Sequence, residues 1–91
     1  MTIKYTRQFL SKLEDIFAES EYTLRYEKGS FKSGYCLLND TKIAIVNKYY
    51  TTEGKISCLI DILKSIRIDN SRLSDKNRSL LMELSQTEIK L

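Results

Sequence analysis

The chain contains no histidine, and this absence limits its chemistry more than any residue that is present. A Ser-His-Asp triad, a Cys-His dyad and a zinc site with histidine ligands are all excluded within one chain. The sequence also has no Walker-type loop and no GxGxxG segment, so the usual phosphate-binding cradles are missing. We therefore expect a protein that is not an enzyme and that holds no metal ion or other cofactor.

The two cysteines, Cys36 and Cys58, are too far apart for a CxxC redox motif and match no zinc-ligand spacing. Cysteine is among the residue types most often buried, so we interpret both as small core residues. The alternative is a reactive thiol at Cys58, which would need a nearby cation such as Lys55 to lower its pKa.

Two consecutive tyrosines mark the best candidate for a contact surface. They follow a predicted strand, precede a predicted helix and have lysines close by in the sequence. Aromatic side chains beside cations can anchor a protein partner or stack on nucleic-acid bases; alternatively, one ring packs under the helix. Phe31, an apolar residue in a polar loop, either folds back on the core or joins this surface. The candidate contact residues are Phe31, Lys48, Tyr49, Tyr50 and Lys55.

Apolar stripes at helical period predict the elements that position these residues. One helix covers residues 6–19, with Thr6 as its N-cap. A second begins at Thr51 or Thr52 and has the clearest stripe in the chain. A third begins at Ser71 or Ser74. The stripe of the second helix comprises Ile56, Leu59, Ile60, Leu63 and Ile66, and that of the third comprises Leu80, Leu81 and Leu84.

Between the first two helices the sequence predicts three strands. Residues 21–28 alternate polar and apolar, which indicates one solvated face, whereas residues 35–38 and 42–47 are apolar on both faces. Asn39 and Asp40 tolerate the left-handed backbone of a hairpin turn. Because the connections are short, we expect an antiparallel meander. The predicted fold is a single α+β domain over residues 1–91, of order α-β-β-β-α-α, with two helices packed on the three-stranded sheet and a C-terminal third helix.

Composition adds only broad limits. Fifteen basic and twelve acidic residues give a net charge of +3, a mild bias that is not typical of a polyanion-binding protein. No apolar run is long enough to span a bilayer, and the first residues do not resemble a signal peptide. We therefore expect a cytoplasmic protein that does not bind membranes.

Residues 34–66 resemble the core of minimal zincin-type metallopeptidases. The strand containing Ile45-Val46-Asn47 is followed by a short loop and by the helix Gly54–Ile66, which would carry the HExxH motif. Asp61-Ile62-Leu63-Lys64-Ser65 stands in the motif's place. The resemblance implies a related scaffold without peptidase activity, since both histidines and the glutamate are absent.

The predicted order α-β-β-β-α is also similar to that of double-stranded-RNA-binding domains. This resemblance implies an RNA contact at the start of the second helix, where Lys55 is the one basic residue of Thr51-Thr52-Glu53-Gly54-Lys55. The whole chain further resembles short bacterial proteins that have no assigned activity.

These observations favour a small non-enzymatic domain that acts through protein–protein contacts, with an unknown partner or with a second copy of itself. One alternative is a nucleic-acid-binding module that uses Lys48, Tyr49, Tyr50 and Lys55. The other is a degenerate metallopeptidase-like scaffold without activity.

Overall fold

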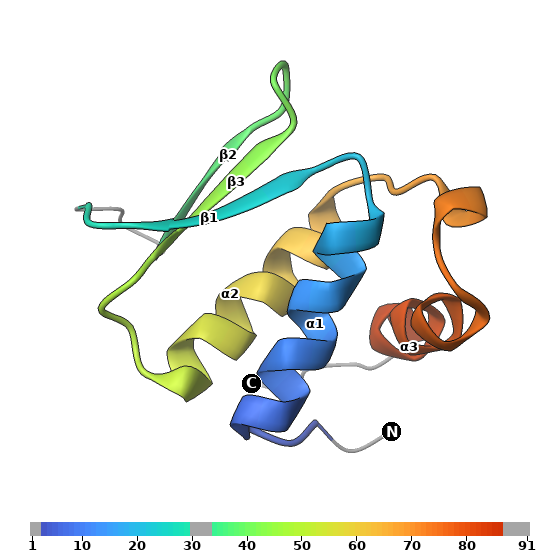
Figure 1. Cartoon of the computed structure of the whole chain (residues 1–91). Helices are drawn as coiled ribbons and strands as arrows, with labels where there is room; N and C mark the ends of the chain where they lie inside the picture. The colour runs from blue at the N-terminus through green and yellow to red at the C-terminus, as the bar shows by residue number, and fades with distance from the viewer. Residues whose placement is uncertain (1–2, 30–33, 87–91) are drawn as a thin grey trace.

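The computed structural model describes residues 3–29 and 34–86 and contains three α-helices and three strands in the predicted order (Figure 1). The predicted α+β class is therefore confirmed. The elements are α1 (Arg7–Glu19), β1 (Thr23–Glu27), β2 (Tyr35–Leu38), β3 (Ile43–Asn47), α2 (Thr52–Ser65), a single 3-10 turn η1 (Asn70–Arg72) and α3 (Asp75–Gln86).

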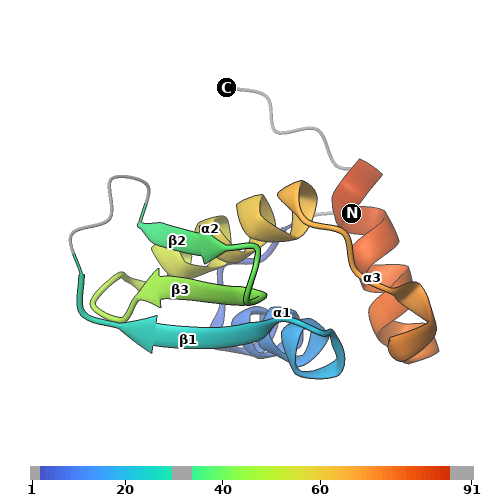
Figure 2. The same cartoon turned by 90° about the horizontal axis from the view of Figure 1, so that it is seen from above.

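The predicted antiparallel meander is wrong in its strand order and in one of its pairings. The order across the sheet is β1-β3-β2 (Figure 2). Strand β3 pairs parallel with β1 and antiparallel with β2. The last strand in the sequence therefore lies in the middle of the sheet, and β1 and β2 are its two borders.

The seven residues that separate β1 from β2 in the sequence are enough to allow this order. Strand β2 runs antiparallel to β1, so β1 ends and β2 begins at the same end of the sheet. The connection must span two strand spacings, about 10 Å, whereas seven residues can reach about 23 Å. The Asn47 side-chain amide donates to the Gly29 carbonyl (3.3 Å), and the Asn47 backbone N–H donates to the Gly34 carbonyl (2.9 Å). These bonds hold Gly29 and Gly34 against the end of β3.

The hairpin between β2 and β3 also differs in detail from the prediction. The residue with the left-handed backbone is Lys42, with a φ of 54°, rather than Asn39 or Asp40. The Lys42 ammonium lies 3.4 Å from a carboxylate oxygen of Glu21, which precedes β1.

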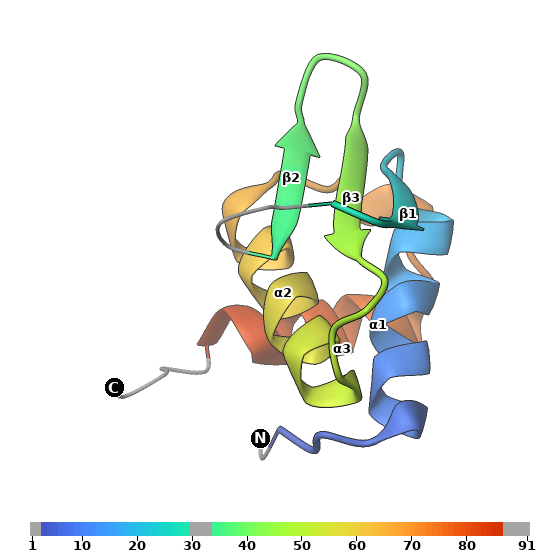
Figure 3. The same ribbon diagram turned by 90° about the vertical axis from the view of Figure 1, so that its left-hand side faces the viewer.

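One face of the sheet is covered by α1 and α2, as predicted (Figures 1 and 3). Helix α1 starts after Thr6 and α2 after Thr51, and each of these threonines caps its helix by accepting a backbone N–H. The two helices and the central strand supply most of the buried core. The fully covered core residues of these three elements are Leu13, Ile16, Phe17, Ala44, Val46, Ile56, Leu59, Ile60 and Ile62.

Helix α3 packs across α1 and α2 and does not cover the second face of the sheet (Figure 2). Leu84 of α3 and Leu73, which precedes the helix, are buried, whereas Leu80 and Leu81 are half-buried and Met82 is exposed. Within the described part of the chain, the second face of the sheet is therefore left uncovered.

Candidate protein-interaction surface

The candidate residues Lys48 and Tyr49 lie on the turn that follows β3. The Tyr49 backbone N–H donates to the Asn47 side-chain oxygen (3.0 Å), which fixes the turn. Tyr49 is 68% exposed, and the Lys48 ammonium lies 5.2 Å from the centre of its ring. This exposed aromatic–cation pair is the part of the predicted contact surface that is free to meet a partner.

Tyr50 has a structural role instead. Its ring lies between Gly34, at the start of β2, and Gly54, in the first turn of α2. A Cβ atom at Gly34 would lie 2.3 Å from the ring, and one at Gly54 would lie 2.9 Å from it. The ring thus joins the sheet to α2 through two positions where a side chain would not fit.

This arrangement predicts that Gly54→Ala changes the stability of the protein in the direction opposite to that usual in a helix. In an exposed helix, replacing glycine by alanine stabilises by up to about 1 kcal/mol. Here Gly54→Ala should destabilise the protein, because its methyl group meets the Tyr50 ring. In a Tyr50→Ala background the same substitution should stabilise. Chemical denaturation of the natural protein, the two single variants and the double variant measures these changes in stability. A stabilising Gly54→Ala in the natural background would contradict the proposed packing.

Lys55 is directed toward the core side of the sheet. Its ammonium lies 5.1 Å from the ring centre of Tyr26, whose hydroxyl donates to a Glu14 carboxylate oxygen. Burial and this hydrogen bond raise the pKa of the Tyr26 phenol well above its ordinary value. Lys55 is thus engaged with Tyr26, and the fifth candidate, Phe31, lies outside the described residues. Among the described candidates, Lys48 and Tyr49 are the most open to stacking on a base, and Tyr50 is 37% exposed.

The two cysteines have different environments. Cys58 is buried on α2, and burial together with the nearby Asp61 carboxylate raises the pKa of its thiol. A raised pKa disfavours the thiolate, so Cys58 is unsuited to nucleophilic chemistry. Cys36 is half-buried and lies outside the hydrophobic core. The prediction of a core residue is therefore confirmed for Cys58 and wrong for Cys36.

The uncovered face of the sheet is apolar on one side and charged on the other. Side chains alternate along a strand, so the residues between the core-facing ones point to this face. Ile45 lies between Cys36 on β2 and Arg25 on β1. In the adjacent row the residues, from β2 to β1, are Leu38, Ile43 and Thr23. We call Cys36, Leu38, Ile43 and Ile45 the open apolar patch; Leu38 is 43% exposed.

The charged side of this face belongs to β1. The Arg25 guanidinium and the Glu27 carboxylate form an ion pair at 2.8 Å, and both side chains are largely exposed. Charged side chains on a border strand discourage pairing with another chain. Strand β2, the opposite border, has the sequence Tyr-Cys-Leu-Leu and carries no charge.

The outer edge of β2 offers backbone groups for pairing (Figure 3). The Asn47 N–H bonds to the Gly34 carbonyl, and hydrogen-bonded pairs alternate along an antiparallel ladder. Cys36 and Leu38 therefore bond to β3, whereas the N–H and C=O groups of Tyr35 and Leu37 point outward. In the described part of the chain no strand lies beyond β2. The border thus lacks the charge and proline that usually protect such an edge.

The described residues contain no group of three or more Cys, Asp or Glu side chains that could hold a metal ion. In the helix segment that was compared with HExxH, Ile62 and Leu63 are buried, whereas Asp61, Lys64 and Ser65 are exposed. Among the helices of residues 3–29 and 34–86, none is long and apolar enough to cross a bilayer.

Comparison of the chain with protein-family models, with curated proteins and with solved structures found no match.

Proposed function

We propose that the protein is a non-enzymatic interaction domain that binds a second copy of itself along the outer edge of β2. The observation that carries the proposal is the uncharged border strand, whose outward N–H and C=O groups have no neighbouring strand in the described residues. An extended segment from another chain can add to such a border by backbone hydrogen bonds.

A second copy fits this border because the arrangement is self-complementary. Two β2 strands related by a two-fold axis would pair antiparallel, and each residue contact would occur twice. Tyr35 and Leu37 of each copy would supply the hydrogen bonds. No charged side chain of one β2 would oppose a like charge on the other.

The distribution of apolar and charged side chains across the sheet also supports a second copy as the partner. The open apolar patch lies on β2 and β3, whereas Arg25 and Glu27 lie on the far strand. Pairing at β2 would bring the patches of two copies side by side in one six-stranded sheet. The charged strands would then lie at the two outer borders, where they limit further growth.

Proline at position 37 tests the backbone pairing. Leu37→Pro removes an outward N–H but no hydrogen bond to β3, and proline is tolerated on a border strand. We expect the natural protein to be a dimer and Leu37→Pro to be a monomer by light scattering. The matched control is Leu37→Ala, which also loses the side chain but keeps the N–H, and it should remain dimeric. A monomeric natural protein, or equal dimerisation of both variants, would overturn the proposal.

The cysteines provide a second readout. Antiparallel pairing places Cys36 of the two copies directly opposite one another or one diagonal apart, with Cβ atoms about 5–8 Å apart. A short bismaleimide should therefore link two chains through Cys36. Cys36→Ser should abolish this product, and Cys58→Ser should not, because Cys58 is buried. A linked dimer that persists in Cys36→Ser would contradict the pairing.

A further inference from the structure

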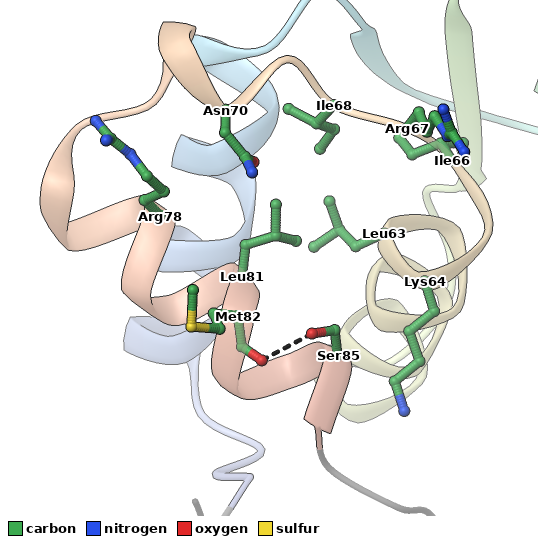
Figure 4. Close-up of a pocket in the computed structure, with 10 residues that line it drawn as sticks. All are labelled: Leu63, Lys64, Ile66, Arg67, Ile68, Asn70, Arg78, Leu81, Met82 and Ser85. Atoms are coloured by element: carbon green, nitrogen blue, oxygen red, sulfur yellow. Dashed lines mark hydrogen bonds between the residues drawn. The ribbon is translucent and has the colours of Figure 1, made fainter.

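A groove separate from the β2 border lies between the C-terminal half of α2, the segment that follows it, and α3 (Figure 4). Its volume is about 530 Å³, which is in the range of ligand-binding pockets. Leu63 of α2 and Leu81 of α3 point toward one another at its centre (Figure 4). Ile66 and Met82 extend this apolar floor, and Met82 is 60% exposed.

The charged side chains that line the groove are all basic. Of the ten residues that line the groove, three are basic and none is acidic. Lys64 and Arg67 stand on the α2 side, and both are exposed. The third, Arg78, is held at the start of α3, where its guanidinium donates to the Leu73 carbonyl (2.9 Å) and pairs with the Asp75 carboxylate (3.3 Å). The α2 side is therefore a cationic rim beside an apolar floor.

We propose that this groove binds an amphipathic helix of a partner protein whose apolar stripe is flanked by acidic residues. A groove between two helices accepts the apolar face of a third through residues spaced i, i+3, i+4 and i+7. The exposed methionine adapts to side chains of different shapes. Carboxylates beside the stripe would meet Lys64 and Arg67, so charge complementarity selects an acidic helix over a basic one.

A labelled synthetic peptide tests the groove with the 91-residue chain. The probe is a helical peptide with leucines at the stripe positions and glutamates on both flanks, and its partner peptide has lysines in place of the glutamates. Fluorescence anisotropy should detect binding of the acidic peptide, and binding should weaken as salt is raised. The basic peptide should not bind. Equal binding of the two peptides would overturn the proposal.

A charge reversal at Arg67 locates the site. Arg67→Glu should raise the dissociation constant of the acidic peptide by about tenfold. Lys76→Glu makes the same charge change on α3 at an exposed residue outside the groove lining, and it should leave binding unchanged. Circular dichroism should show that both variants are folded. Equal effects of the two substitutions would place the peptide elsewhere and refute the proposal.

Two other occupants are outcomes of the same experiment. If the protein binds vesicles of phosphatidylglycerol but not the acidic peptide, the ligand of the groove is an anionic lipid surface and the helix proposal is refuted. If deletion of residues 87–91 raises the affinity for the peptide about tenfold or more, the groove is instead occupied by those residues. Unchanged affinity after the deletion, together with no binding to vesicles, would support a partner helix.

Discussion

Asn77→Ala should lower the free energy of unfolding by about 2 kcal/mol, because it removes a buried hydrogen-bonding group. Asn77 is 2% exposed, and its side-chain amide donates to carboxylate oxygens of Asp15 (2.9 Å) and Glu19 (2.8 Å). Its backbone N–H bonds to the Ser74 hydroxyl at the start of α3. The substitution therefore weakens the attachment of α3 to α1 as well as the local hydrogen bonding.

Urea unfolding measures this loss, with Ser79→Ala, an exposed position on the same helix, as the control. An Asn77→Ala variant as stable as the control would refute the proposed anchoring role.

The pH dependence of stability provides a related check. The Ser74 backbone N–H and the Asn77 amide lower the pKa of Glu19 below its ordinary value of 4.5. The Glu19 carboxylate therefore stabilises the folded state fully above pH 4.5, and this stabilisation is lost as the pH falls through the lowered pKa.

Gly34→Ala should be the most destabilising of the glycine substitutions, by about 3 kcal/mol. Two costs combine at this position. The φ of Gly34 is +84°, a backbone conformation that a residue with a Cβ atom rarely adopts. In addition, the new methyl group would lie 2.3 Å from the Tyr50 ring, which would have to move.

A second substitution separates these two costs. In a Tyr50→Ala background the steric conflict is absent, so Gly34→Ala should cost about 1–2 kcal/mol, the contribution of the backbone alone. Thermal and chemical unfolding of the four proteins gives both numbers. An equal cost of Gly34→Ala with and without the Tyr50 ring would show that the ring does not pack against this glycine.

The elements that depend on local pattern could be predicted from the sequence. The apolar stripes and the capping threonines Thr6 and Thr51 identified α1 and α2, and alternation identified β1. The strand order could not be obtained from loop length, because a loop of seven residues can skip a neighbouring strand. The pattern gave part of the answer: β1 alternates, as expected of a border strand, but β2 and β3 are both apolar on two faces, so it did not show which of them is central.

The candidate surface was predicted only in part, because exposure depends on contacts between distant residues. Tyr49 is exposed as expected, but Tyr50 packs against Gly34, which lies on another element. Cys36 lies outside the core because it alternates with Tyr35 and Leu37, which pack against the core, and because the described helices cover one face of the sheet. Asn77 gave no sequence signal, since its carboxylate partners come from α1.

Backbone amide exchange along β2 tests the central proposal most directly. In a dimer paired through β2, the amide protons of Tyr35 and Leu37 are hydrogen-bonded to the second copy, whereas in a monomer they face solvent. We predict that both amides exchange more slowly as protein concentration rises, while the amides of the Lys48–Tyr49 turn do not change. Rapid exchange at Tyr35 and Leu37 at every concentration would contradict self-association through this strand.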